Sequence, residues 1–301
     1  AWNLGRWEEL ENYTKEMDPN NFDQTFYQAI LSIHENDLPQ TKEVLEKGWD
    51  IVDAKLPGLL RESYIRAYPV VVEIQQLCDI EEVVKYKTKE ETYESREELL
   101  SLWNARLKGC SPSIDIWEKF LSFRPLLVTP EEDLDTWIQF SELCMKNGQM
   151  RLAGDTLETL MLRTNYNKNA FYSKIYSEVS ESEAFHPASV VFVYLKYLYK
   201  QGPKQKALDL LRNFVEEQET QKAPGTDLCR YYLQLSKWQK HLMQDDFNCE
   251  VLNKALKSIE TATAHNSKSP KVWHKWGMLN FEALSHYERP LKDAGAFNIP
   301  T

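Results

Sequence analysis

The chain has 301 residues, of which 42% are hydrophobic and 27% charged, and its formal net charge is −10. This acidic balance argues against nucleic acids and anionic membrane surfaces as partners, because both require a basic protein surface. With only 10 glycines, the chain is also poor in the residue from which phosphate-binding loops and β-barrels are built.

Apolar residues recur at helical spacing nearly everywhere, starting with the first segments of the chain. Helical hairpins are predicted over Thr25–Asp53, Glu62–Lys87 and Arg96–Phe123. One short phrase occurs twice, as LGRW at residues 4–7 and as LSKW at residues 235–238. We interpret each copy as the turn inside a hairpin, with its Trp packing the second helix on the first. Since almost nothing precedes Leu4, this interpretation also predicts that the chain begins inside a repeat and is a fragment of a longer protein.

The next hairpin, over residues 135–162, has the clearest pattern. Its break at Asn147-Gly148 is typical of a helix end, because glycine adopts the left-handed conformation without a steric penalty. Trp137, Gly148 and Ala153 are spaced as in a tetratricopeptide repeat. The alanine is expected where the two helices cross closely.

Two predicted loops and two further repeat registers follow. A long loop or insertion is expected at 163–189, where Asn, Ser and Tyr dominate, and a shorter loop at 220–227. Between these loops Gly202 and Ala207 repeat the five-residue spacing, with Pro203 in the first turn of the second helix. After them, the spacing of Ala255 and Trp273 predicts one more junction between repeats.

The last predicted helix carries an aromatic stripe. Trp273, Trp276 and Phe281 are expected in the core between repeats, and Gly277 is expected at a close helix approach. All these elements together predict an all-α solenoid of tetratricopeptide-like hairpins, an α-α superhelix formed by a single region over residues 1–301.

No pattern of catalytic residues is found. The sequence contains no nucleotide-binding, kinase, hydrolase or metalloprotease motif. Its six histidines are dispersed, its acidic pairs fall at predicted helix starts or turns, and its five cysteines form no CxxC pair. No apolar run has the length of a membrane-spanning helix. The residues therefore predict neither an active site, nor a metal centre, nor membrane insertion.

One charge pattern leaves two interpretations open. No acidic residue occurs between Glu183 and Asp209, although the chain as a whole is acidic. Lys196 and Lys200 are four residues apart and so share a helix face, and two more lysines follow the turn after Gly202. These lysines form either an ordinary solvated face or one wall of an anion-binding concavity.

Several segments resemble the FAT region of the target-of-rapamycin (TOR) kinases, in the phosphatidylinositol-3-kinase-related family. They include AWNLGRWEELENY, ESYIRAYPVVVEIQQLCDIEEVVKYK, TWIQFSELCMKNGQMRLAG and KVWHKWGMLNFEAL. These segments occur in the family's order and cover nearly the whole chain. The stretch 163–189 and the residues after Tyr287 match poorly.

The resemblance implies a non-catalytic scaffold that braces a serine/threonine kinase domain located further along a parent chain. Implied partners are that kinase domain and the protein subunits of a nutrient-responsive, TOR-type complex, which is cytoplasmic or peripheral at endomembranes. No cofactor is required, but a family ligand, inositol hexakisphosphate, would bind between repeats. The residues that correspond to its pocket are Lys196, Lys200, Arg66 and Lys87.

Two competing hypotheses have other sequence requirements. A free-standing tetratricopeptide adaptor would bind peptide partners through a polar concave surface, and the start inside a repeat argues against it. A helical enzyme would need clustered titratable residues, which the sequence does not show.

Overall fold

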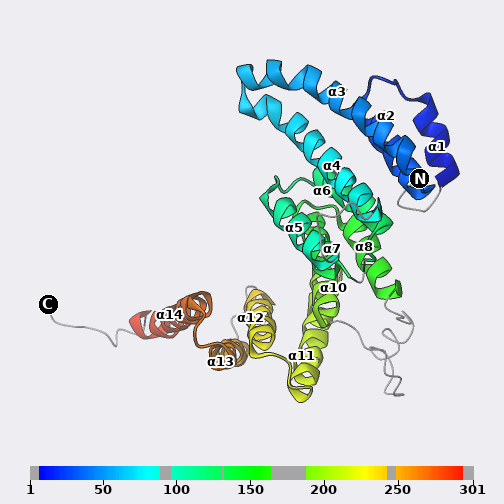
Figure 1. The fold of residues 1–301 in the computed structure, drawn as a ribbon. Coiled ribbons are helices and arrows are strands. Elements are labelled where there is room, and N and C mark those ends of the chain that lie inside the picture. The colour runs from blue at the N-terminus through cyan, green and yellow to red at the C-terminus, as the bar shows by residue number, and fades with distance from the viewer. Residues whose placement is uncertain (1–6, 89–95, 131, 164–187, 243–248, 294–301) are drawn as a thin grey trace. The chain divides into compact units, whose positions relative to one another are not determined.

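The computed structural model describes residues 7–88, 96–130, 132–163, 188–242 and 249–293. Every regular element within these ranges is a helix, and consecutive helices pack against one another (Figure 1). The all-α hairpin solenoid predicted from the sequence is thereby confirmed. The chain divides into two compact units, residues 1–152 and 153–301, which are described one at a time.

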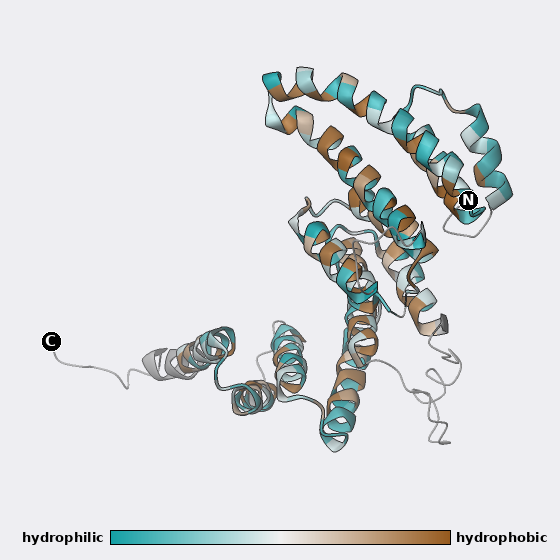
Figure 2. Cartoon of the chain, in the orientation of Figure 1, coloured by the Kyte–Doolittle hydropathy of each residue, from teal (hydrophilic) through white to brown (hydrophobic). Residues whose placement is uncertain are grey.

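Unit 1 is built around three helices that lie side by side, α2, α3 and α4 (Figure 1). Fully buried apolar side chains such as Phe26, Ile30, Leu77 and Ile80 fill the space between them. In Figure 2 the apolar residues form stripes along these helices, as expected for helices that bury one face. The helices of unit 1 are α1 (Trp7–Glu16), α2 (Phe22–His34), α3 (Leu38–Glu62), α4 (Tyr64–Thr88), α5 (Arg96–Gly109), α6 (Ile114–Phe123), the 3₁₀ turn η2 (Arg124–Leu126) and α7 (Leu134–Lys146).

Local sequence explains where several of these helices begin and end. The Asn21 side chain caps α2 by accepting a hydrogen bond from the backbone N–H of Asp23 at 3.1 Å. Asp37 caps α3 in the same way through the N–H of Gln40, again at 3.1 Å. At the other end of α7, Gly148 adopts a φ of +81°, so the predicted glycine stop is confirmed.

The hairpin predicted over Glu62–Lys87 is wrong, because this stretch is a single helix. Helix α3 continues to Glu62, and after Ser63 helix α4 runs unbroken from Tyr64 to Thr88 with Pro69 inside it. Pro69 lies near the start of α4 and is exposed, so its ring meets solvent and not a neighbouring helix. The buried residues after it, from Val70 onward, pack α4 into unit 1 and outweigh the local cost of the proline. The predictions for Thr25–Asp53 and Arg96–Phe123 are confirmed as helix pairs.

In unit 2 the core lies mainly between α10, α11 and α12. Phe192, Leu195, Leu211 and Trp238 are among its buried members. The helices of unit 2 are α10 (Ala188–Gln201), α11 (Lys204–Thr220), α12 (Gly225–Leu242), α13 (Cys249–His265) and α14 (Pro270–Asp293), while α8 (Met150–Arg163) crosses the border between the units.

The small-residue positions of the predicted repeats are confirmed. Ala153 and Ala255 are completely buried, and Ala207 is 2% exposed. At Gly154, a Cβ would lie 2.4 Å from the Tyr197 hydroxyl oxygen, so the Tyr197 side chain of α10 packs against α8 there. The predicted place of Pro203 is wrong by one position, because it is the cap residue before α11 and not part of the first turn.

The duplicated phrase does not form the predicted turn at residues 235–238. Leu235–Trp238 lies inside the continuous helix α12. Trp238 does pack helices together, because its ring stacks on that of Tyr199 in α10 with the centroids 4.0 Å apart. In the first copy, Leu4 lies outside the described residues, and Trp7 begins α1 and stacks on His34 at 3.8 Å.

The aromatic stripe of α14 is mostly exposed, which contradicts its predicted place in the core. Trp273 is 45% and Phe281 66% exposed, and no atom lies within 4 Å of a Cβ built on Gly277. The faces of α14 that are buried carry Val272, Leu279 and Ala283 instead. Of the two predicted loops, 163–189 falls almost wholly outside the described residues, and the second is the short turn between Thr220 and Gly225.

Candidate functional site

The predicted lysine face lies on α10 and is joined by a cation from α12. The Lys196 ammonium nitrogen lies 4.4 Å from the centroid of the Phe192 ring, and the Arg230 guanidinium carbon lies 5.2 Å from the same centroid. Lys200 follows in the last turn of α10. Two helices of unit 2 therefore bring cations to one aromatic ring, which attracts both through its quadrupole.

Arg230 is a residue that the sequence interpretation missed. It is 34 positions beyond Lys196 and belongs to a segment, DLCRYYLQ, that shows no basic pattern. Only the packing of α10, α11 and α12 against one another brings it to Phe192. No signal in a single sequence reveals that proximity.

The other two predicted ligands, Arg66 and Lys87, lie in unit 1 near opposite ends of α4. At 1.5 Å per residue they are about 32 Å apart along the helix. Arg66 forms an ion pair with Glu62, while the Lys87 ammonium donates to the Ile33 carbonyl oxygen at 3.3 Å and to Asn36 at 3.4 Å. Partial burial lowers the pKa of Lys87. One compact ligand cannot contact both residues, so the structure does not bring this predicted pair together.

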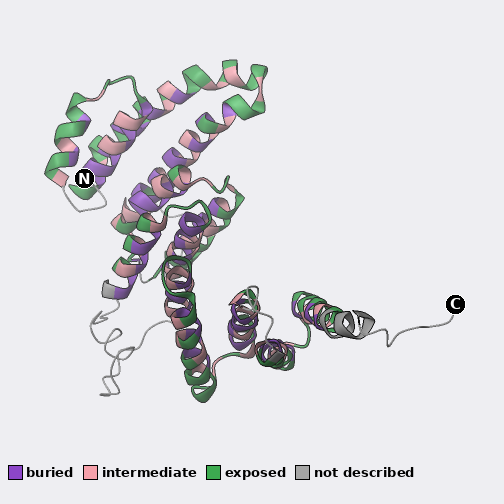
Figure 3. Ribbon diagram, turned by 180° about the vertical axis from the view of Figure 1, so that it is seen from behind, coloured by how far each residue is buried: buried purple, intermediate pink, exposed green. Residues whose placement is uncertain are grey.

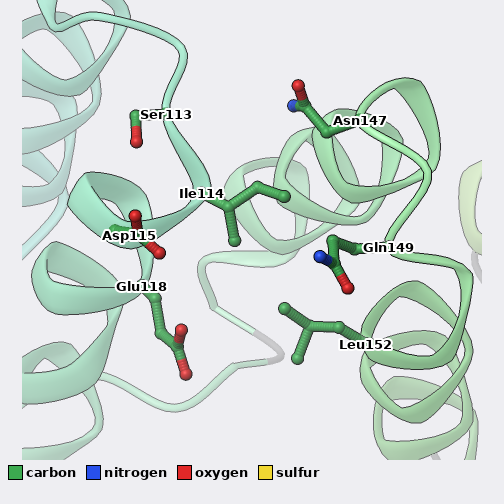
Figure 4. Close-up of a pocket in the computed structure, with 7 residues that line it drawn as sticks. All are labelled: Ser113, Ile114, Asp115, Glu118, Asn147, Gln149 and Leu152. Atoms are coloured by element: carbon green, nitrogen blue, oxygen red, sulfur yellow. The ribbon is translucent and has the colours of Figure 1, made fainter.

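Unit 1 contains an open polar hollow of about 590 Å³ between α6 and the turn that joins α7 to α8 (Figure 4). Asp115 and Glu118 project into it from α6, and Asn147 and Gln149 lie opposite. Its remaining lining residues are Ser113, Ile114 and Leu152. The Asn147 amide also donates to the Leu143 carbonyl oxygen at 3.0 Å, so it helps to end α7. The hollow offers carboxylate and amide oxygens but no nucleophile paired with a base.

A first buried charge network joins α4 to α5. The Arg106 guanidinium donates to both oxygens of Glu82 at 2.8 Å and to Asp79 at 2.9 Å. The Trp103 indole N–H donates to Glu82 at 2.8 Å, and the Gln75 amide donates to Asp79 at 2.6 Å. Desolvation raises the pKa of Asp79 to about 6, against the opposing effects of Gln75 and Arg106. All these groups form hydrogen bonds with one another, so the network has a structural role.

A second network fixes α7 to the segment before it. The side chains of Arg124 and Asp133 are each 2% exposed and form an ion pair at 2.6 Å. Asn104 accepts from Arg124 at 2.7 Å, and the Thr136 hydroxyl donates to Asp133 at 2.5 Å. The Arg124 guanidinium also lies 5.6 Å from the centroid of the Trp103 ring. These hydrogen bonds compensate in part for the loss of water around the pair, while the buried Arg124 Nε atom has no hydrogen-bond partner.

Other chemistry-bearing groups show no arrangement for catalysis within the described ranges. No group of three His, Cys, Asp or Glu residues there is placed to hold a metal ion. Burial raises the pKa of the Cys144 thiol to about 11, which makes that thiol a poor nucleophile. None of the described helices combines the length and apolarity needed to cross a membrane.

Comparison with known proteins gives the family. The model of the FAT domain matches residues 1–295. The chain belongs to the FAT domain family. The resemblance to the FAT region of TOR kinases, identified from the sequence, is thereby confirmed.

The related proteins are large kinases. Over 95% of its length the chain is 31% identical to the serine/threonine-protein kinase TOR2 of Saccharomyces cerevisiae, and it covers 12% of that protein. It is 30% identical to the serine/threonine-protein kinase mTor of Drosophila melanogaster over 94% of its length, covering 11% of that protein. For tor1 of Schizosaccharomyces pombe the identity is 29%, with 96% and 13% covered. This FAT domain therefore spans about one eighth of the kinases that it matches.

Proposed function

We propose that this FAT domain is a non-catalytic scaffold within a TOR-like serine/threonine kinase, where it braces the kinase domain and offers surfaces to subunits of a cytoplasmic, nutrient-responsive complex. The observation that carries the proposal is the match of nearly the whole chain to the FAT domain, together with its kinase relatives. A free-standing adaptor fits less well, because the relatives named above are kinases in which the matching segment is one small part.

The packing of the chain suits a bracing role. Within the described residues, long helices such as α3 and α4 are joined by short turns, and the buried networks of unit 1 link neighbouring helices. The side chains of the Arg124–Asp133 ion pair are each only 2% exposed. If the kinase domain depends on this framework, damage to the pair should reduce kinase activity without any change in the catalytic residues.

Asp133→Asn tests this dependence in the full-length parent kinase. The substitution leaves the buried Arg124 charge uncompensated and should destabilise unit 1 by about 3–5 kcal/mol. We expect lower phosphorylation of a peptide substrate per mole of kinase. The matched control is Asp135→Asn, the same change at an exposed position two residues further on in α7. Full activity of the Asp133→Asn kinase, with unit 1 shown to be destabilised, would exclude bracing.

The 301-residue chain alone should not bind ATP. A titration of the chain with ATP and Mg²⁺ should therefore give no saturable binding isotherm.

We also propose that the cations around Phe192 form the wall of a site for inositol hexakisphosphate, with Arg230 in addition to Lys196 and Lys200. The contacts of Lys196 and Arg230 with one ring support this, because a compact polyanion can accept hydrogen bonds from several neighbouring cations at once. Each charge-assisted hydrogen bond to a phosphate would contribute about 1.5–3 kcal/mol.

Thermal unfolding with and without inositol hexakisphosphate tests the site. Ligand that binds only the folded state should raise the melting temperature of the wild-type chain. The Lys196→Glu/Lys200→Glu variant should lose the shift, whereas Lys254→Glu/Lys257→Glu on the exposed side of α13 should retain it. An equal shift in all three proteins would exclude this site.

A further inference from the structure

The polar hollow of unit 1 presents mainly hydrogen-bond acceptors. Asp115 and Glu118 project into it from α6 (Figure 4). On the opposite side, the Asn147 amide donates to the Leu143 carbonyl oxygen, and the Asn147 amide oxygen remains as an acceptor. Ionised carboxylates accept hydrogen bonds and donate none. A ligand of this hollow must therefore be rich in hydrogen-bond donors.

The lining of the hollow is also negatively charged. None of its seven lining residues is a cation. The Asp115 carboxylate has no hydrogen-bond or ion-pair partner among the described residues. Lys119 is directed to α2, where it donates to Asp23 at 2.7 Å. The charge of Glu118 acts as far as α7, because it is the next cause after burial that raises the pKa of the Cys144 thiol. A hollow lined by one sign of charge attracts the opposite sign, so a cation is favoured here.

The size and the apolar part of the hollow indicate which kind of cation fits. Its volume of about 590 Å³ is in the range of sites for organic ligands, about 300–1,000 Å³. Ile114 and Leu152 offer apolar surface to an aliphatic stem. Arginine and lysine side chains combine such a stem with a charged head. The planar guanidinium of arginine has five N–H donors and can serve two carboxylates at once, whereas the lysine ammonium carries its three donors on one nitrogen.

The hollow suits an arginine of a protein better than a free small molecule. Sites for small molecules are lined mainly by apolar side chains that enclose most of the ligand. Here only Ile114 and Leu152 of the seven lining residues are apolar, and the hollow is open. Arginine is also enriched among the residues that dominate protein interfaces. We propose that this hollow is a docking site for an arginine side chain of a protein partner, with its guanidinium bonded to Asp115 and Glu118. The inference does not depend on the role in a kinase.

Titration of the isotope-labelled 301-residue chain with the blocked peptide acetyl-Gly-Ser-Arg-Ser-Gly-amide, followed by NMR, tests the site. We expect saturable shifts of the side-chain amide signals of Asn147 and Gln149, and binding that weakens as salt is added. The same peptide with citrulline in place of arginine keeps the shape but loses the charge, so it should bind at least about tenfold more weakly. Free arginine should bind no more tightly than the arginine peptide.

Asp115→Asn/Glu118→Gln should weaken binding of the arginine peptide at least about tenfold, because it removes both charges and keeps the shape of the hollow. The matched control is Glu43→Gln/Glu46→Gln, which removes two charges at the same three-residue spacing from exposed positions of α3 and should leave binding unchanged. Circular dichroism verifies that each variant is folded. Asp115→Asn alone, at an exposed position, replaces the double variant if that variant is not folded.

The proposal is overturned if the arginine peptide does not bind, if the citrulline peptide binds equally well, or if the two double variants bind alike. Tighter binding of free arginine than of the peptide would overturn the protein partner and assign the hollow to a small molecule.

Discussion

Gly154 leaves room on α8 for the side chain of Tyr197 from α10. A Cβ at this position would lie 2.4 Å from the hydroxyl oxygen and 2.9 Å from the Cζ atom of Tyr197. In an exposed helix a change from glycine to alanine is favourable by about 1 kcal/mol, because alanine loses less backbone entropy on folding. Here the steric conflict with the Tyr197 ring exceeds that gain.

Gly154→Ala is therefore expected to lower the free energy of unfolding by about 1–3 kcal/mol through overpacking. Gly277→Ala in α14 is the matched control, since nothing lies within 4 Å of a Cβ there, and it should raise the free energy of unfolding by about 0.5–1 kcal/mol. Urea unfolding followed by circular dichroism measures both changes. Changes of the same sign in the two variants would show that the Tyr197 side chain does not pack against Gly154.

At the scale of elements, two acids of α4 share Arg106 of α5 but differ in their effect on stability. Glu82 accepts two hydrogen bonds from Arg106 and one from Trp103, so its charge is well compensated. Asp79 accepts one from Arg106 and one from Gln75, and desolvation still raises its pKa to about 6. A raised folded-state pKa means that ionised Asp79 costs stability at neutral pH.

The contribution of Asp79 to the free energy of unfolding falls as the pH rises. Asp79 is protonated more readily in the folded than in the unfolded chain, so its contribution to stability is greatest below about pH 4 and is lost as the pH rises through about 6. Asp79→Asn should remove that loss and raise the free energy of unfolding at about pH 7 by about 1–3 kcal/mol relative to wild type. This difference in the free energy of unfolding between the variant and wild type should disappear at about pH 4. Urea titrations of both proteins across this range measure the difference.

Glu82→Gln provides the contrast on the same helix. It replaces a carboxylate that is 8% exposed and leaves Arg106 with weaker partners, so it should destabilise the chain at neutral pH. If Asp79→Asn and Glu82→Gln destabilise the chain equally at neutral pH, desolvation does not dominate at Asp79.

At the scale of the whole molecule, each helix packs mainly on its neighbours in sequence. Stability in such an array is approximately a sum of local terms, so the effects of a substitution should stay local. Ala207→Leu, at a position 2% exposed, should reduce hydrogen-exchange protection in α10, α11 and α12 and cost about 1–3 kcal/mol there. Protection of α2, α3 and α4 should not change. Gln205→Leu, at an exposed position of the same helix, is the control. A uniform loss of protection would indicate that the whole chain unfolds as one cooperative unit.

The features predicted correctly from the sequence were those set by local geometry. Gly148 marks a helix end because its backbone conformation is specific to glycine, and Ala153 and Ala207 mark close helix approaches because larger side chains do not fit. Predictions failed where the structure depends on packing between helices that the sequence pattern does not reveal. Pro69 is tolerated within α4 because the rest of the helix is held by its neighbours, and the exposure of Trp273 depends on which face of α14 meets α13.

In the candidate lysine site, too, local spacing was predicted correctly and contacts made by helix packing were not. The four-residue spacing of Lys196 and Lys200 correctly predicted that they follow one another on a single helix. Arg230 could not be found, because its proximity to Lys196 is created by the packing of three helices. The expected meeting of Arg66 and Lys87 rested on the family resemblance alone, and the continuous α4 holds the two residues apart.

The α3–α4 hairpin has a practical consequence for protein engineering. Its two helices have 25 residues each, about 37 Å at 1.5 Å per residue, and a single residue, Ser63, joins them. Between Val52 and Ala67 no side chain is buried, and Figure 3 shows the exposed end of the hairpin in green. An epitope tag or a fluorescent reporter inserted after Ser63 would therefore interrupt no core contact, so this tip is a natural attachment point for following the protein inside cells.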